Sequence, residues 1–450
     1  MMAGLLHMQF SNILEVLKMA KLTQMISKKK EFVVDIDKEI YGKGLTDRKH
    51  ANYEIYKKPS LEVTFCGKKF ENPFILAAAP PTDDLDMVRR AFKMGWAGAV
   101  LKTTSIEGTK VDLAYPMMTG LEYNGQKLFG MGNIDLISEH HIDVVEKRVA
   151  ALKKEFPKKI VIASMMGSKQ SDWQTLPQRL TEAGADMIEC SFSCPQGSMG
   201  EDPGKMLAQS IPASEKTARW VKESAGKTPV IIKITPQVTD IVAVAQALKH
   251  AGVDAIAASN SIPALMGVDI ETFVPYPNLG GKSTYSGYTG PAIKPITLRT
   301  IAEIKRNVDI PISGTGGAMN WRDAVEFMAV GANIVQFCTA VMHYGFRIID
   351  DLTSGFANYM AKMKFTSPEQ IVGKALKNIV THDELPRRKV RSKIDIEKCI
   401  RCDLCFVACR DGGHFAIELD EDRTPIVNED RCVGCALCQR LCPIDCIEVK

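Results

Sequence analysis

The cysteines near the C-terminus constrain this chain more than any other feature, because they repeat one spacing twice. Of 13 cysteines in 450 residues, nine lie between Cys399 and Cys446. Eight of them form the runs Cys399-x2-Cys402-x2-Cys405-x3-Cys409 and Cys432-x2-Cys435-x2-Cys438-x3-Cys442-Pro443. Two such runs are typical of chains that hold two iron–sulfur cubes, in which the fourth cysteine of each run ligates the other cluster. The spacing predicts one [4Fe–4S] cluster on Cys399, Cys402, Cys405 and Cys442, and a second on Cys432, Cys435, Cys438 and Cys409.

Structural zinc and unliganded core cysteines are the alternatives for these runs. Zinc sites usually pair two C-x-x-C units, whereas here each triplet is followed by a trailing fourth cysteine. Cys446 is left over and is expected to be a buried spectator. A secreted disulfide protein would spread its cysteines differently, and we find no signal peptide.

The overall composition is that of an ordinary soluble protein. Its 45% hydrophobic and 24% charged residues exclude wholesale disorder, and a net charge of +4 is too weak to indicate a nucleic-acid or membrane-surface protein. The sequence contains no run near the ~20 apolar residues of a membrane span, so we expect a cytoplasmic protein. Residues 1–60 are predicted to form a helical extension that packs on the protein or on a subunit face, with a membrane anchor as the less favoured alternative.

From about Ser60 onward, short apolar runs alternate with helix-like segments. The runs are Phe74–Ala78, Gly98–Leu101, Ile160–Met165, Met187–Cys190, Val230–Ile234, Ala255–Ala258, Ile310–Ser313 and Ile334–Phe337. Between them lie Met87–Met94, Trp173–Ala183, Ile241–Ala251 and Trp321–Val330, among others. Eight strand–helix repeats in about 300 residues favour a (β/α)8 TIM barrel over an open doubly wound sheet. No Gly-x-Gly-x-x-Gly follows the first run, which also disfavours a dinucleotide-binding fold.

These patterns divide the chain into four parts. An N-terminal extension covers residues 1–60, and an α/β barrel covers residues 61–380. A linker covers residues 381–393, where Pro386 and a run of basic residues make a poor core element. An α+β domain like a two-cluster ferredoxin covers residues 394–450.

Polar residues follow the strands at the end of the barrel where catalytic groups are expected. Lys102 and Lys233 end two strands, and together they favour an anionic, electron-accepting cofactor such as a flavin. The alternative is that each lysine extends outward to solvent. Gly316 and Gly317 follow the seventh strand and would let a phosphate approach, with Thr339 as a supporting hydroxyl; a plain tight turn is the alternative.

The order of these motifs resembles the FMN- and iron–sulfur-containing part of the dihydropyrimidine dehydrogenase family, especially its bacterial NAD-dependent subunit form. The resemblance runs from about Leu61 to Val449. It rests on segments such as Asn72-Pro73-Phe74, Lys102-Thr103, Ser193-Cys194-Pro195, Lys233-Ile234-Thr235-Pro236 and Asp445-Cys446-Ile447. It implies a barrel like that of dihydroorotate dehydrogenases, with FMN on its rim.

The resemblance also assigns residues and partners. The implied FMN contacts are Ala77, Ala78, Lys102, Thr103, Lys233 and Gly290, with Gly316, Gly317, Cys338 and Thr339 at the phosphate end. The implied pyrimidine-binding residues are Asn133, Ser191, Asn260 and Ser261. A separate subunit that binds FAD and NAD(P)H would send electrons through the two clusters to FMN, which would reduce the C=C bond of uracil, thymine or a related cyclic amide.

The chain departs from the family at two points. Ser191 stands where the family has Asn, which removes an amide from the expected substrate site. The resemblance also implies an acid cysteine on the loop after the fourth strand, and residues 200–210 contain no cysteine. Ser210 is therefore the predicted catalytic proton donor, with Glu201 and Lys205 as substitutes. The alternative for Ser210 is a helix cap.

Two other functions remain open from the sequence. The barrel is also compatible with oxidation of dihydroorotate, although Ser191 argues mildly against it. The missing loop cysteine also leaves open a less favoured alternative, an electron-transfer scaffold that binds flavin and clusters but performs no substrate chemistry of its own.

Overall fold

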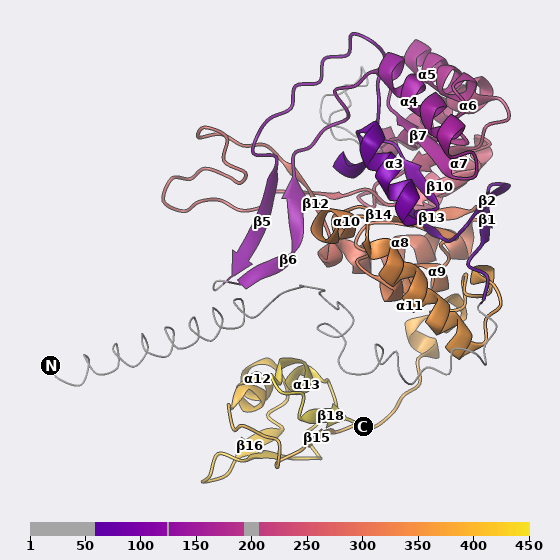
Figure 1. Ribbon diagram of the computed structural model, residues 1–450. Coiled ribbons are helices and arrows are strands. Elements are labelled where there is room, and N and C mark those ends of the chain that lie inside the picture. The colour runs from indigo at the N-terminus through magenta and orange to yellow at the C-terminus, as the bar shows by residue number, and fades with distance from the viewer. Residues whose placement is uncertain (1–58, 124–125, 193–206) are drawn as a thin grey trace, which may run out of the picture. The chain divides into compact units, whose positions relative to one another are not determined.

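The computed structural model describes residues 59–123, 126–192 and 207–450 (Figure 1). The predicted N-terminal extension therefore lies outside the described residues, except for its last two positions. The chain divides after Gly373 into two compact units, and each is described by itself. In the described part of the chain, no helix is long and apolar enough to cross a membrane.

The first unit is built on a closed barrel of eight parallel strands. Their order around the barrel is β10-β13-β14-β3-β4-β7-β8-β9, and β9 pairs with β10 to close it. The bounds are β3 Phe74–Leu76, β4 Gly98–Val100, β7 Ile160–Met165, β8 Met187–Ser191, β9 Val230–Lys233, β10 Ala255–Ala258, β13 Ile312–Thr315 and β14 Ile334–Phe337. These strands correspond to the eight predicted apolar runs, so the predicted TIM barrel is confirmed.

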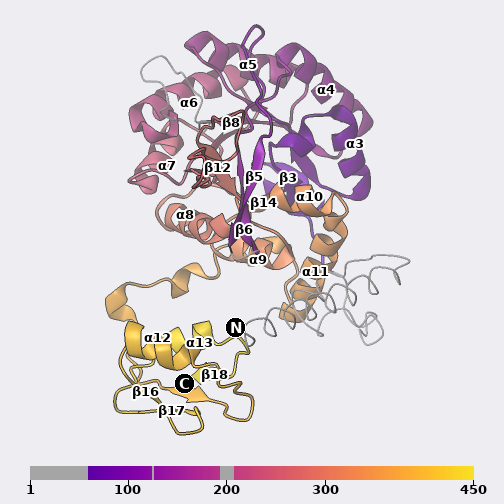
Figure 2. The same ribbon diagram turned by 90° about the vertical axis from the view of Figure 1, so that its left-hand side faces the viewer.

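Helices surround the strands, as Figure 2 shows. They are α3 Leu85–Met94, α4 Ile142–Glu155, α5 Gln170–Glu182, α6 Ile211–Ala225, α7 Ile241–His250, α8 Lys294–Asn307, α9 Trp321–Ala329, α10 Thr339–Tyr344 and α11 Ile348–Met363. Short 3-10 helices are η1 Pro80–Thr82, η2 Leu207–Gln209, η3 Pro291–Ile293, η4 Pro368–Gln370, η5 Leu376–Asn378 and η6 His382–Glu384. Helix α3 shows how the sequence sets such bounds: Asp84 caps its first turn, and Gly95 ends it at φ +113°.

The core lies between the strands and the helices. Phe337 of β14 packs edge-on against Phe74 of β3 and against Trp96, with ring centroids 6.0 Å apart in both pairs. A hairpin of β1 (Val63–Phe65) and β2 (Lys68–Phe70) packs its apolar side chains against the inward residues of the strands. This apolar packing fills one part of the barrel interior, and the polar residues gather at the carboxyl ends of the strands.

A second, antiparallel sheet rises from those carboxyl ends (Figure 1). Its order is β11-β12-β6-β5, with β5 at Met118–Tyr123, β6 at Gln126–Asn133, β11 at Ile262–Ala264 and β12 at Ser286–Thr289. The segments follow β4 and β10 of the barrel. The sequence analysis did not predict this sheet. Because β6 ends at Asn133 and β11 follows Ser261, the sheet carries two predicted substrate-binding residues.

The second unit contains two α-helices, the 3-10 helices η5 and η6, and two small antiparallel pairs of strands. Helix α12 is Leu404–Gly412 and α13 is Leu437–Leu441. Strand β15 (Ser392–Ile394) pairs with β18 (Ile447–Val449), and β16 (Ile417–Leu419) pairs with β17 (Pro425–Val427). The first two residues of strand β15 lie within the segment 381–393 that the sequence analysis assigned to the linker. The mixture of short helices and strands agrees with the predicted α+β class.

Candidate active site and cluster sites

A cavity of about 660 Å³ opens at the carboxyl ends of the barrel strands. It is lined by most of the residues predicted to bind cofactor or substrate: Ala77, Ala78, Thr103, Asn133, Ser191, Lys233, Asn260, Ser261, Gly290, Gly316, Gly317, Cys338 and Thr339. Its volume is in the usual range for cofactor sites, about 300–1,000 Å³. The structure therefore brings together in one cavity residues as far apart in the chain as Ala77 and Thr339.

Lys102 follows the end of β4 by two residues and is not among the described residues that line this cavity. A carboxylate holds its side chain. Its Nζ lies 2.8 and 2.9 Å from the two side-chain oxygens of Asp135. Asp135 lines the cavity, and burial raises the pKa of its carboxyl group; the nearby Lys102 cation opposes that rise and the Asp83 carboxylate adds to it. The sequence analysis missed Asp135. No local pattern points to it, because Asp135 lies 33 positions from Lys102 in the sequence.

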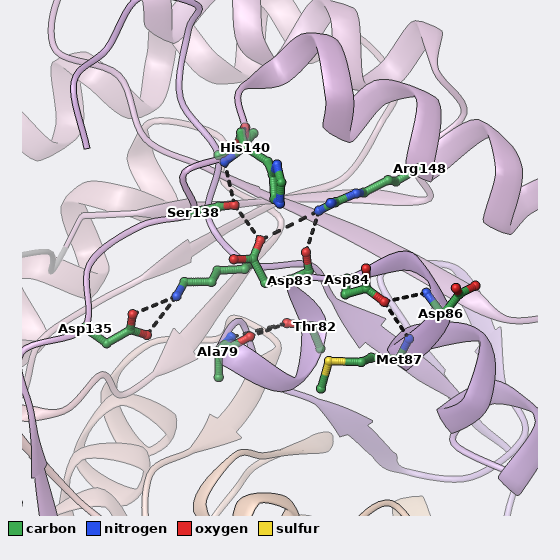
Figure 3. Close-up of polar contacts among 12 residues, drawn as sticks. Ala79, Thr82, Asp83, Asp84, Asp86, Met87, Asp135, Ser138, His140 and Arg148 are labelled. Carbon is green, nitrogen blue, oxygen red and sulfur yellow. Dashed lines mark hydrogen bonds and ion pairs between the residues drawn. The ribbon is translucent and has the colours of Figure 1, made fainter. Parts of the chain in front are cut away.

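A second set of polar contacts fixes the segment after β6, which carries Asp135; Figure 3 draws them. Asp83 accepts a hydrogen bond from Ser138 Oγ at 2.5 Å and forms an ion pair with Arg148 at 3.8 Å. Ser138 Oγ in turn accepts a hydrogen bond from the backbone N–H of His140 at 3.0 Å. These bonds hold the segment after β6 against the loop after β3, and so keep Asp135 at the cavity.

The predicted phosphate end is shaped by glycine backbone. Gly316 and Gly317 have φ values of +110° and +99°, a region that favours glycine. A Cβ atom at Gly317 would lie 2.7 Å from the backbone nitrogen of Lys294 and 3.0 Å from the backbone oxygen of Gly290. Cys338 lines the same part of the cavity, and burial raises the pKa of its thiol to about 11. A neutral thiol and a close-packed glycine turn are compatible with a phosphate group.

The predicted substrate side is built from amides whose orientation is set by backbone contacts. Asn133 Nδ2 donates to the backbone oxygen of Gly287 at 2.9 Å. The side-chain oxygen of Asn260 accepts from the backbone N–H of Ser261 at 2.8 Å, and the backbone N–H of Asn260 donates to the backbone oxygen of Ile234 at 2.9 Å. Such an arrangement suits a small ring with both hydrogen-bond donors and acceptors.

Gln209 and Gln237 also line the cavity, and the sequence analysis did not single them out. Gln209 Nε2 donates to the backbone oxygen of Gln237 at 3.4 Å, and both side chains reach the cavity wall. The backbone N–H of Ala208 donates to Phe192 O at 2.9 Å, which places Gln209 beside the end of β8 and near Ser191.

The predicted proton donor Ser210 lies at the start of helix α6. Its Oγ accepts a hydrogen bond from the backbone N–H of Ala213 at 3.4 Å, and Ser210 is not among the described residues that line the cavity. Glu201 and Lys205, the alternatives to Ser210, lie outside the described residues. Cys194 does as well; it follows the cavity residue Ser191 by three positions.

The cysteines of the second unit gather in two separate groups. One hollow is lined by Cys399, Cys402, Cys405 and Cys442, together with Cys446, and another is lined by Cys409, Cys432, Cys435 and Cys438. Each group contains three cysteines of one run and the fourth cysteine of the other, which is the grouping the spacing predicts. Cys446 is buried and lies 3.4 Å from Cys442, Sγ to Sγ. The thiolate chemistry and the grouping fit two cubic clusters.

Comparison with known proteins identifies two family models. The model of the dihydroorotate dehydrogenase family matches residues 60–360, and the model of the 4Fe–4S dicluster domain matches residues 392–449. Together they cover the described parts of both units apart from the segment between them.

Several curated relatives are similar over most of the chain. The PreA subunit of NAD-dependent dihydropyrimidine dehydrogenase from Escherichia coli is 40% identical over 397 residues, which cover 86% of this chain and 95% of that protein. The chloroplastic dihydropyrimidine dehydrogenase (NADP(+)) of Arabidopsis thaliana is 34% identical over 344 residues, 74% of this chain and 80% of that protein. The catalytic subunit of dihydroorotate dehydrogenase B (NAD(+)) from Pyrococcus abyssi is 33% identical over 317 residues, 70% of this chain and 99% of that protein.

Proposed function

Because this chain belongs to the dihydroorotate dehydrogenase family and carries a two-cluster ferredoxin domain, we propose that it is the pyrimidine-reducing subunit of a dihydropyrimidine dehydrogenase. The family is one of FMN-dependent oxidoreductases that act on CH–CH groups, and the dicluster domain indicates two iron–sulfur clusters. The proposed reaction adds a hydride to one carbon of the uracil or thymine double bond and a proton to the other. Its electrons come from a partner subunit that binds FAD and NAD(P)H.

The observation that carries the proposal is that the similarity to a dihydropyrimidine dehydrogenase subunit extends over both units. The match to the Escherichia coli subunit covers 397 residues, whereas the match to the Pyrococcus abyssi dihydroorotate dehydrogenase subunit ends after 317, at 99% of that protein. A barrel with its clusters on the same chain thus favours pyrimidine reduction. Dihydroorotate oxidation is the second candidate, because the barrel model is that of dihydroorotate dehydrogenases.

Residues in and beside the cavity support this proposal, because each can take one role in the reaction. When bound, FMN would supply the hydride, and the clusters would supply its electrons. Lys233 and Lys102 place positive charge at the cavity, where it favours negative charge on the cofactor. Asn133 and Asn260 orient the substrate through its ring amides, and the glycine turn at Gly316 and Gly317 accepts the phosphate.

The proton donor can be identified by comparing one hydroxyl-bearing and one thiol-bearing residue that follow β8 in the sequence. Ser210 is the predicted donor, and Cys194 is the thiol that follows Ser191 most closely in the sequence. Loss of a general acid lowers turnover by about 10²–10⁴-fold and changes its pH profile. The variants Ser210→Ala and Cys194→Ala are compared with each other for uracil reduction, with FMN content as the control. The residue whose loss has this effect, while FMN is retained, is the donor; Ser210 is excluded if only Cys194→Ala has it.

One preparation distinguishes the two candidate functions. Uracil and thymine are supplied with a chemical electron donor, and dihydroorotate is supplied with an electron acceptor; both rates are measured. The proposal predicts dihydropyrimidine product and no orotate. Orotate formation without pyrimidine reduction would assign the second candidate.

A further inference from the structure

A layer of polar side chains lies inside the barrel, next to the cavity, at strand positions usually occupied by apolar residues. Glu189 is on β8, Gln336 is on β14 and Ser313 is on β13. Gln336 Nε2 donates to Glu189 Oε2 at 2.7 Å and to Ser313 Oγ at 3.1 Å. The side chain of Glu189 is fully buried, so its charge has no contact with solvent.

The second oxygen of Glu189 faces a lysine of the cavity. Oε1 lies 3.6 Å from Nζ of Lys233 and makes no hydrogen bond within the described part of the chain. Lys233 and Gln336 line the cavity, whereas Glu189 is not among the described residues that do. Glu189 therefore contacts two residues of the cavity wall, Lys233 and Gln336, without lining the cavity itself.

Burying a carboxylate lowers the stability of the folded protein, and packing does not require one at this position. Removing a carboxylate from water costs several kcal/mol unless a cation and hydrogen bonds compensate, and an apolar residue of similar size is often as good for stability. The residues paired with Glu189 across the sheet are Ile231 of β9 and Ser164 of β7, and Ser164 Oγ shares a hydrogen bond with Thr103 Oγ1 at 2.9 Å. Neither residue supplies a charge that would compensate the carboxylate. A charge at this position therefore points to a role in the chemistry of the cavity.

The expected role is an effect on the reduction potential of the bound flavin. An ammonium beside a flavin stabilises the negative charge that the flavin gains on reduction, and so raises its reduction potential. A carboxylate 3.6 Å from that ammonium offsets part of its field, and it also draws Nζ toward the barrel interior. Lys233 also acts on the cavity residue Cys338: burial raises the pKa of that thiol, the Lys233 and Lys102 cations lower it and the Asp135 carboxylate raises it.

We propose that Glu189 is a positioning residue that holds Lys233 and thereby keeps the bound flavin a stronger reductant than the lysine alone would allow. The proposal rests on the proposed function only in that the cavity binds FMN; it does not depend on which substrate is reduced. Lys102 has its own carboxylate in Asp135, so each of these two cations beside the cavity is balanced by a separate acid.

The test is the reduction potential of the flavin in the holoenzyme, measured by equilibration with redox dyes after subtraction of the cluster absorbance. Glu189→Gln keeps the size of the side chain and an acceptor for Gln336, and removes the charge. The ratio of reduced to oxidised flavin at a fixed potential should rise at least tenfold, which is a shift of about 30 mV for two electrons. Ser313→Ala, which alters the same layer without changing its charge, should leave the potential unchanged.

Two further variants test whether Glu189 acts through Lys233. Glu189→Asp retains the charge at a longer distance, so it should raise the potential in the same direction but by less, and it serves if Glu189→Gln does not fold. In a Lys233→Gln background, Glu189→Gln should have a much smaller effect, because the residue acts through the lysine.

An unchanged potential in a Glu189→Gln enzyme that retains FMN would overturn the proposal. An equal shift with and without Lys233 would overturn the positioning role as well. Failure of uracil to react, with the potential shifted as expected, would count against the proposed substrate and leave this inference intact.

Discussion

At the scale of single residues, the cavity has two main features. Lysines paired with carboxylates lie beside it, and a glycine turn at Gly316 and Gly317 leaves no room for a side chain. Lys102 and Lys233 each face a carboxylate, Asp135 at 2.8 Å and Glu189 at 3.6 Å. The expected cofactor would therefore bind where cations are present but partly neutralised. Such a site can hold an anion and still leave a reduced flavin able to give up its electrons.

The thiol of Cys338 gives a prediction about pH. Burial raises its pKa to about 11, so the group remains neutral, and uncharged toward a phosphate, until the pH approaches that value. Between about pH 8 and about pH 10, the dissociation constant of FMN should follow the same curve in the wild type and in Cys338→Ser, measured by flavin fluorescence. Weaker binding in the wild type alone above about pH 9 would show that the thiol ionises in this range and that its pKa is not raised.

Gly317→Ala tests the glycine turn. The added methyl would collide with backbone atoms of Lys294 and Gly290, so we expect FMN to bind about tenfold more weakly or worse, roughly 1.4 kcal/mol. Gly280→Ala is the matched control, because Gly280 also has a positive φ (+61°) but its Cβ would meet nothing within 4 Å. Both variants carry the strain of the left-handed backbone, and the collision is specific to Gly317. Equal FMN affinity in the two variants would exclude the turn from the phosphate site.

Some residues of the site could be predicted from the sequence and others could not. The difference depends on where each residue lies in the alternation of apolar runs and helix-like segments. Lys233 and Gly316 could be found because each directly follows or ends an apolar run, and the carboxyl ends of barrel strands meet. Glu189 could not, because it lies in the middle of a strand where the pattern predicts an apolar side chain. Asp135 and Gln237 lie on connections whose path depends on tertiary contacts, so their approach to the cavity is visible only in the structure.

At the scale of elements, the barrel strands and the antiparallel sheet have different origins in the sequence. The barrel strands are short, apolar and buried on both faces, so each appears as an uninterrupted apolar run. Strands β5 and β6 contain glycines and polar residues, and the partner strands β11 and β12 come more than 120 positions later. No local pattern predicts such pairing. The family resemblance implied Asn133 as a substrate contact, but the sheet that holds it was not predicted.

A glycine on that sheet provides the next prediction. A Cβ atom at Gly287 would lie 2.5 Å from Ser261 Oγ and 3.4 Å from Asn133 Nδ2. Gly287→Ala should displace these predicted substrate contacts and raise the KM for uracil about tenfold, with FMN content unchanged. Gly120→Ala is the control, because it lies on β5 of the same sheet and its Cβ would meet nothing within 4 Å. Equal KM values for the two variants would remove Asn133 and Ser261 from the substrate site.

At the scale of the whole molecule, the cavity and the predicted cluster ligands lie in different units. The barrel unit contains the cavity, and the C-terminal unit contains two groups of four predicted ligands. The cluster domain was the part most fully predictable from the sequence, because iron–sulfur ligation fixes both residue type and spacing. The position of the fifth cysteine beside one group was not predictable, since nothing in the spacing distinguishes Cys446 from a core residue.

Cys409→Ala tests the grouping of the cysteines. It should remove the cluster whose other ligands are Cys432, Cys435 and Cys438, so that iron per chain falls by about half and FMN content stays the same. Cys446→Ala is the control and should retain its iron, since Cys442 is the predicted ligand of the other group. An iron loss in Cys446→Ala equal to that in Cys442→Ala would show that the fifth cysteine is a ligand.

The central claim is that the cavity reduces pyrimidines, and single-turnover flavin absorbance tests it most directly. The holoenzyme is reduced with dithionite under anaerobic conditions, the excess is removed, and uracil, thymine or another unsaturated cyclic amide is added. We predict rapid reoxidation of the flavin by uracil or thymine, with formation of the corresponding dihydropyrimidine. If none of these compounds reoxidises the flavin, the proposed function is wrong.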